Sequence, residues 1–208
     1  WISKLPDTAL GRRVVADLRR HDVETAVTWA DGRQGLQFHE TGAFPREAVT
    51  HHDRGDTVAA TVTPDALPMR DVQNADAVFT GTSTLALSEQ TTETGQALLE
   101  AAHGSGAITA TDVDYQPGLA PPETVRATVE RVFGHTDVVF VGEEQASSVL
   151  NLSGQPRDMA LTLAGDYDFE LVVVTRGECA AVALNDSPGT NVVNERRATD
   201  TETVDLTG

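Results

Sequence analysis

The sequence has a single cysteine, Cys179, among its 208 residues. One cysteine excludes a disulfide within the chain and is typical of a reducing compartment. The histidines are scattered, and only His51 and His52 are adjacent. Because neighbouring residues of an extended strand point to opposite faces, this pair predicts a surface segment and not a two-ligand metal site.

Long hydrophobic runs are also missing. A membrane-spanning helix needs about 18 consecutive apolar residues. The sequence has no stretch of that length. Residues 1–6 do not resemble a secretory signal. Together with the single cysteine, these absences predict a cytoplasmic protein with no membrane partner.

Lysine is almost absent, since Lys4 is the only one and the other basic residues are arginines. The chain has 32 acidic and 15 basic residues, which gives a net charge of −17. At molar salt the Debye length falls to about 3 Å and screens such self-repulsion, so this composition predicts a halophilic protein. The acidic residues are spread between apolar segments, which excludes an acidic tail, and the negative field argues against nucleic acid as a partner.

The sequence also lacks the P-loop, the G-x-G-x-x-G fingerprint and the G-x-S-x-G nucleophile motif. What it has instead is a regular order of elements. Residues 7–21 read as a helix capped by Asp7 or Thr8, and residues 25–29 and 35–39 alternate like the strands of a β-hairpin or small sheet. Because that sheet is poor in apolar residues, we expect residues 24–62 to form a flap, or β-lid, over the main domain.

After Pro64 the sequence alternates between strands and helices. The expected strands are 77–79, 108–113, 138–141 and 171–174, with helices at about 92–103 and 121–134 between them. Successive apolar strands separated by helices predict a doubly wound α/β fold, with a mostly parallel sheet covered by helices on both faces. We expect residues 1–208 to form one domain of this kind.

Each expected strand ends in polar or small residues, at 81–83, 112–116, 142–145 and 175–178. The carboxyl ends of parallel strands meet at one edge of the sheet, where ligands of such folds bind. Hydroxyl, amide and carboxyl groups there suit the oxygens of a sugar or a phosphate. For Asp114 and Tyr115 the alternative is structural, because they precede Pro117 and Gly118 and could simply open a turn.

The order of several short motifs resembles the ribokinase (PfkB) family of carbohydrate kinases over the whole chain. They are SKLPDT (3–8), LGR (10–12), GL (35–36), DR (53–54), DVDYQP (112–117), VTRGE (174–178) and VDLTG (204–208). Within the family the likeness is greatest to the 2-keto-3-deoxygluconate kinases, particularly haloarchaeal ones. The resemblance implies an α/β domain with a protruding β-lid, and transfer of a phosphoryl group from ATP with Mg2+ to a primary hydroxyl of a keto-sugar acid.

The resemblance also assigns the sugar site. Arg54 matches a lid arginine that binds the sugar acid, and Gln37, on another expected strand of the lid, is a further candidate for substrate binding. Tyr115 matches the middle of an Asn-Tyr-Arg substrate motif, in which Asp114 and Gln116 replace the asparagine and the arginine. Losing that arginine removes a charge-assisted bond to a carboxylate, so a kinase for fructose or another neutral sugar is the alternative.

For the nucleotide, the resemblance implies a site near Thr175, Arg176 and Gly177. The family's Asn-x-x-Glu motif falls on residues 142–145, where both marker residues differ and Glu143 or Glu144 is either a substitute or an ordinary acidic residue at a helix start. These changes leave open a diverged protein that binds sugar or nucleotide without turnover.

At the end of the chain, the resemblance implies that Asp205 lies near a monovalent cation such as K+, and that Gly208 opens the anion hole. The family's general base, an aspartate, would follow just beyond Gly208. We therefore expect an incomplete chain, inactive by itself, from a longer sugar kinase. The resemblance also makes the lid a candidate surface for a homo-oligomer.

Overall fold

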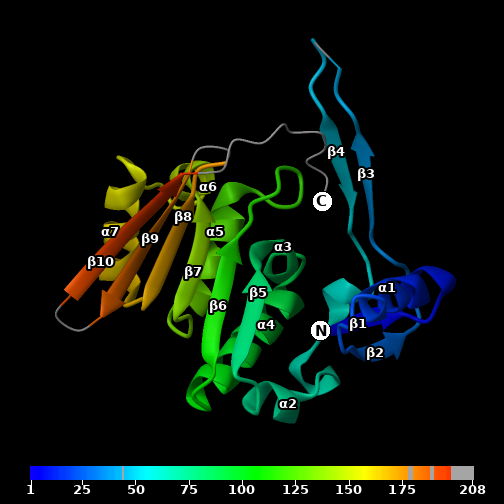
Figure 1. Cartoon of the computed structure of the whole chain (residues 1–208). Helices are drawn as coiled ribbons and strands as arrows, with labels where there is room; N and C mark the ends of the chain where they lie inside the picture. Colours follow the sequence, from blue (N-terminus) through cyan, green and yellow to red (C-terminus); the bar gives the residue numbers. More distant parts are fainter. Residues whose placement is uncertain (44, 178–179, 188–189, 198–208) are drawn as a thin grey trace.

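A computed structural model describes residues 1–43, 45–177, 180–187 and 190–197 of the chain. Its centre is a six-stranded sheet in the order β10-β9-β8-β7-β6-β5 (Figure 1). The four strands β5 (Ala77–Gly81), β6 (Ile108–Val113), β7 (Val138–Gly142) and β8 (Leu171–Thr175) run parallel. Strands β9 (Ala180–Ser187) and β10 (Thr190–Arg197) add an antiparallel hairpin. The predicted α/β fold with a mostly parallel sheet is confirmed.

The helices of this domain lie together behind the sheet in Figure 1. They are α3 (Thr82–Leu85), α4 (Glu89–Gly104), α5 (Pro122–Phe133), α6 (Glu143–Ser148) and α7 (Pro156–Tyr167). Alternate strand residues such as Val139 and Val172 face them and are fully buried with Val129 and Leu163. Each such side chain contributes about 1.5–3 kcal/mol by leaving water.

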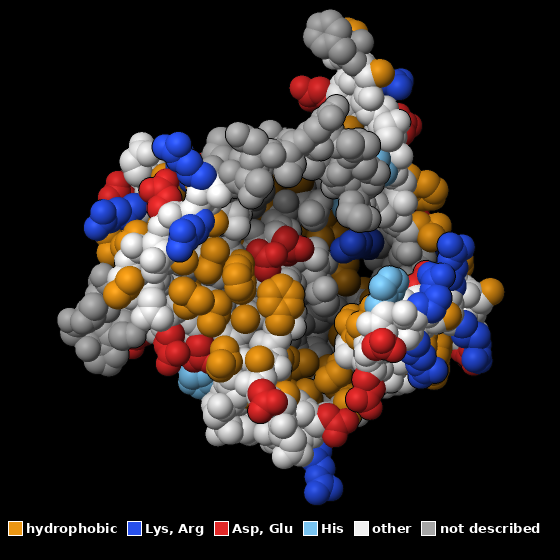
Figure 2. Space-filling view, in the orientation of Figure 1, with side chains coloured by type: hydrophobic (Ala, Val, Ile, Leu, Met, Phe, Trp, Pro, Cys, Tyr) orange, Lys and Arg blue, Asp and Glu red, His pale blue; other side chains and the backbone are white. Residues whose placement is uncertain are grey.

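The opposite face of the sheet differs from the prediction, which placed helices on both faces. In the part of the chain that the structure describes, the helices cover one face. Phe79 and Ile108 point the other way and are 63% and 55% exposed. Figure 2 shows hydrophobic side chains gathered on this open face. Apolar residues at successive strand positions predict that both faces of the sheet are apolar. They do not predict which elements cover each face.

The N-terminal part forms a separate two-stranded parallel sheet of β1 (Ile2–Pro6) and β2 (Ala26–Ala30). Helix α1 (Ala9–Arg19) connects the two strands, and its first turn is capped by Thr8, whose side chain accepts a hydrogen bond from the Gly11 amide. The predicted helix is confirmed, and Thr8 is its cap. The predicted pairing of residues 25–29 with 35–39 is wrong, because β2 pairs with β1, a strand that sequence reasoning missed.

A second small sheet forms the arm that projects beyond the large sheet in Figure 1. It is the antiparallel hairpin of β3 (Leu36–Glu40) and β4 (Val49–Asp53), which we call the lid. On one of its faces Leu36, Phe38 and Val49 are all exposed. An oligomer through the lid stays a prediction.

The remaining segments, the 3-10 turns at Ala59–Thr61 and Pro64–Ala66 and helix α2 (Met69–Gln73), lead from the lid to β5. Among the described residues, none of the helices has the length and apolar character of a membrane span.

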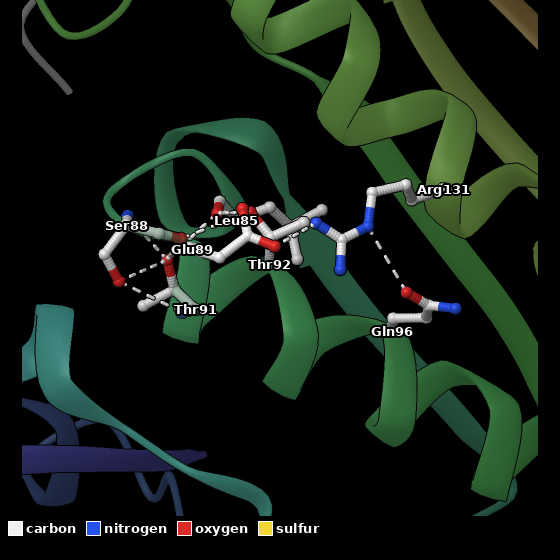
Figure 3. A network of polar contacts seen from close by, with 7 residues as sticks. All are labelled: Leu85, Ser88, Glu89, Thr91, Thr92, Gln96 and Arg131. Atoms are coloured by element: carbon white, nitrogen blue, oxygen red, sulfur yellow. Dashed lines mark hydrogen bonds and ion pairs between the residues drawn. The ribbon is translucent and has the colours of Figure 1, made fainter.

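A polar network fixes α3 to the neighbouring helices (Figure 3). The side chains of Thr91 and Thr92 both donate hydrogen bonds to the Leu85 carbonyl oxygen over 2.9 Å, at the end of α3. Ser88 caps α4, and Arg131 of α5 binds Glu89 over 2.6 Å. Because α3 begins directly after β5, this network holds the carboxyl end of β5 in place.

Candidate active site at the carboxyl edge of the sheet

The carboxyl ends of the four parallel strands meet at one edge, as the sequence predicts. Gly81 of β5 is paired with Asp112 of β6, and Gly142 of β7 is paired with Thr175 of β8. All four of the predicted polar segments therefore lie at this edge, except that Glu178 falls outside the described residues.

The Asp114 carboxylate at this edge is bound to the two residues that follow β5. Its Oδ1 accepts hydrogen bonds from the Thr82 hydroxyl and the Ser83 amide, each over 2.8 Å. A Cβ atom on Gly81 would lie only 3.1 Å from the same oxygen, so glycine at that position allows the carboxylate to approach. The predicted turn is also present, but it starts at Gln116, whose carbonyl oxygen accepts from the Leu119 amide over 3.1 Å.

Arg54 reaches the same edge from the lid side. It follows β4, is half-buried, and its Nη1 donates to the Ser83 carbonyl oxygen over 3.3 Å. Its neighbour Asp53 pairs with Arg33 instead. The structure thus brings Arg54 and Asp114 to opposite sides of one residue, Ser83.

Asp112 is the titratable group at the end of β6 with an unusual environment. Its pKa is raised to about 6, first because burial disfavours the charged carboxylate and second because Asp114 is negatively charged. A carboxyl group that gains and loses its proton near neutral pH is typical of functional clefts. Asp112 lines a cavity of about 350 Å³ together with Phe79, Phe140, Val141 and Thr175.

A larger pocket of about 800 Å³ adjoins the ends of β7 and β8. Small, polar and acidic side chains dominate its wall, which consists of Gly142, Glu143, Glu144, Gln145, Ser147, Ser148, Thr175, Arg176 and Gly177. Thr175 lines both cavities. The three residues predicted to bind nucleotide therefore lie together in the larger one, which has the size of a small-molecule site.

Arg176 and Glu143 form an ion pair in the wall of this pocket. The Arg176 Nε lies 3.0 Å from a Glu143 carboxylate oxygen, and its Nη1 lies 3.7 Å from Glu195. Gly177 follows with a φ of +54°, a left-handed conformation that favours glycine. The pair joins the strand end of β8 to the start of α6.

The polar face of the lid carries His39 and His52, which the sequence analysis did not assign to the site. His52 lies directly opposite Gln37, and His39 binds Thr50 over 2.9 Å on the same face. The Nδ1 atom of His52 is buried and has no hydrogen-bond partner among the described residues. The i, i+2 spacing of His52 and Arg54 was the available signal, because it places both side chains on one face of an extended strand. His51 points to the other face, as predicted.

The other predicted site residues lie less directly at this edge. Tyr115 is half-buried and packs against the main core, Gln116 is half-buried, and Gln37 is exposed. Asp205 and Gly208, as well as Cys179, lie outside the described residues. Within the described ranges no group of three or more His, Cys, Asp or Glu side chains is arranged to hold a metal ion by itself.

Comparison with known proteins agrees with this architecture. The chain is 43% identical over 209 aligned residues to a 2-dehydro-3-deoxygalactonokinase of Haloferax volcanii, and the match includes all of this chain and 64% of that protein. The chain therefore spans less than two thirds of this curated relative.

Solved structures share the fold at low sequence identity. A 2-dehydro-3-deoxygluconokinase of Thermotoga maritima superposes with a TM-score of 0.80 at 20% identity, with 94% of this chain and 64% of that chain covered. A fructokinase of Xylella fastidiosa with bound ATP gives 0.82 at 14% identity, with 97% and 61% covered. The sequence model described as "pfkB family carbohydrate kinase" matches residues 1–208. The chain belongs to the pfkB family of carbohydrate kinases.

Proposed function

We propose that this chain is the sugar-binding and part of the nucleotide-binding portion of an ATP-dependent kinase, which phosphorylates a primary hydroxyl of a 2-keto-3-deoxy sugar acid. The observation that carries the proposal is the position of Arg54. In a chain with a net charge of −17, its guanidinium lies at the carboxyl edge of the sheet, bound to Ser83. A fixed cation there would hold the carboxylate of a sugar acid by charge-assisted hydrogen bonds.

The Haloferax volcanii relative supports the substrate class. Its name refers to the galacto form of the keto acid, whereas the motif resemblance indicates the gluco form. The two sugars differ in the configuration of one hydroxyl, so the same cation at Arg54 serves both. We propose the keto-deoxy acids as a class.

The larger pocket is where we place ATP. Its volume and its small side chains suit a nucleotide, and its two carboxylates, Glu143 and Glu144, are the groups that would hold the Mg2+. The metal would neutralise phosphate charge during transfer. The chain's own residues would position the two substrates and stabilise charge during transfer. Arg54 and the lid would bind the sugar, and Thr175–Gly177 would bind the nucleotide.

The test is a comparison of substrates on the full-length gene product in molar KCl. ADP release from ATP is measured with 2-keto-3-deoxygalactonate, 2-keto-3-deoxygluconate and fructose. We expect turnover of the two acids and a kcat/KM for fructose that is lower by at least about tenfold, since fructose lacks the carboxylate that Arg54 binds. Preference for fructose would move the protein to the neutral-sugar kinases. Binding of the acids without ADP release would make it a non-catalytic homologue.

A further inference from the structure

Among the described residues, the Asp114 carboxylate and the Arg54 guanidinium form no ion pair with each other, although both bind Ser83. The Asp114 carboxylate accepts a hydrogen bond from the Ser83 amide over 2.8 Å, and the Ser83 carbonyl oxygen accepts a hydrogen bond from Arg54 over 3.3 Å. The Thr82 hydroxyl is a second donor to the same Asp114 oxygen, also over 2.8 Å. One carboxylate oxygen therefore fixes both residues that follow β5.

We infer that Asp114 is a positioning residue, which holds the backbone of Ser83 so that the Ser83 carbonyl oxygen can orient Arg54 toward the sugar acid. The inference rests on the proposed function, because the role of Arg54 in binding the acid belongs to it. In this inference Asp114 does not contact the substrate and acts through the Ser83 backbone.

The chemistry of the cluster explains why an acidic residue suits this place. Asp114 uses one carboxylate oxygen to accept two hydrogen bonds, one from the Thr82 hydroxyl and one from the Ser83 amide. Hydrogen bonds to an ionised acceptor are roughly twice as strong as neutral ones, so the aspartate holds this turn more firmly than an amide would. The close approach depends on Gly81, where a Cβ atom would meet Asp114 at 3.1 Å.

The chain that follows Ser83 is also held in place. Ser83 lies in α3, and the last residue of α3, Leu85, is bound by Thr91 and Thr92 of α4. Arg54 is thus held by a carbonyl oxygen whose own chain is fastened at both ends. A side chain held in one orientation loses less conformational entropy when it binds a ligand, and this lowers KM.

The first test is kinetic and uses the full-length gene product with ATP and 2-keto-3-deoxygalactonate. Asp114→Ala should raise KM for the acid about tenfold, which is the effect of one lost positioning interaction. KM for ATP should stay within about twofold. Asp114→Asn keeps an oxygen that can accept both bonds and should remain within about threefold of the wild type.

Non-additivity separates positioning from an independent role. If Asp114 acts through Arg54, the double variant Arg54→Ala with Asp114→Ala should have the same KM for the acid as Arg54→Ala alone. Effects that multiply would overturn the inference. So would an Asp114→Asn variant as impaired as Asp114→Ala, because the charge and not the hydrogen bonds would then be what matters.

A second measurement does not depend on turnover, so it tests the inference even if the proposed function fails. The same protein is labelled with 15N-serine and 15N-arginine, and NMR follows the exchange of the Ser83 amide and the mobility of the Arg54 guanidinium. Asp114→Ala should speed exchange at Ser83 and free Arg54, while Asp114→Asn should change both much less. An Arg54 side chain that is equally mobile in the wild type and in Asp114→Ala would contradict the inference. Failure of every keto acid as a substrate, with the NMR result as expected, would instead count against the proposed function.

Discussion

The rings of Phe79 and Phe140 meet edge to face on the open side of the sheet, with centroids 6.4 Å apart. Phe133, by contrast, is 1% exposed and packs edge to face against Phe169 on the helix-covered side.

These two environments predict different costs of the same truncation. In the 208-residue chain, Phe133→Ala should lower the free energy of unfolding by about 3–5 kcal/mol, because it leaves a cavity in a closed core. Phe79→Ala should cost about 1 kcal/mol or less, since most of that ring is already in water. Denaturant unfolding in molar KCl measures both values, and equal costs would mean that the face bearing Phe79 is covered.

The open face also shows what sequence patterns can and cannot predict. The apolar pattern located the strands β5–β8 and the helices α4 and α5. Helix α4 nevertheless begins at Glu89, before the predicted start at about residue 92, because the Ser88 cap was not recognised. Pairing partners were harder. The residues of β2 alternate equally well for either neighbour, so nothing local revealed that the strand pairs in parallel with residues 2–6.

In the candidate site, too, some features were predictable from the sequence and others were not. The polar strand ends at Asp112, Asp114 and Thr175 were predictable because parallel strands share an edge. The interactions among them were not. Asp114 binds Ser83 and Thr82, which are 31 and 32 positions away in the chain. These bonds depend on how the start of α3 lies beside the end of β6, and no spacing in the sequence indicates it.

Salt should govern stability through the net charge of −17. The Debye length shortens from about 10 Å at 0.1 M to about 3 Å at 1 M, which screens the self-repulsion of the folded state. We therefore expect Tm to rise steeply with KCl over this range, as measured by scanning calorimetry. A Tm that stays flat between these concentrations would contradict the halophilic interpretation.

Asp112 should make stability depend on pH. Its pKa is raised from 3.8 to about 6 on folding, so between these values the folded chain holds a proton that the unfolded chain has lost. This contribution therefore destabilises the fold as pH rises from about 4 to 6, and the penalty persists above 6. Asp112→Asn cannot ionise and should have a higher Tm than the wild type at pH 7.5, with a difference that shrinks toward pH 4.

The same substitution at an exposed aspartate provides the control for this pH profile. Asp65→Asn removes one negative charge without removing a buried carboxylate. If Asp65→Asn reproduces the Tm difference of Asp112→Asn over pH 4–7.5, the gain comes from net charge and not from the burial of Asp112.

Arg176 should affect the nucleotide and not the sugar. Because its side chain lines the larger pocket and is already bound to Glu143 over 3.0 Å, it is held in place for phosphate oxygens. Arg176→Ala should raise KM for ATP about tenfold, near the lower end for a charge-assisted hydrogen bond. KM for the keto acid should stay unchanged. Arg157→Ala, an exposed arginine on α7, is the matched control, and an equal effect of the two changes would place ATP elsewhere.

The central claim is that Arg54 binds the carboxylate of a sugar acid, and one substitution tests it most directly. KM for 2-keto-3-deoxygalactonate and for ATP is measured for Arg54→Ala in the full-length gene product, beside Arg46→Ala, which changes an exposed arginine between the two lid strands. We predict a rise of about 10- to 100-fold in KM for the acid, with KM for ATP and the Arg46 variant nearly unchanged, because one charge-assisted bond to the acid is lost. A KM for the acid that stays at the wild-type value in Arg54→Ala would contradict the account.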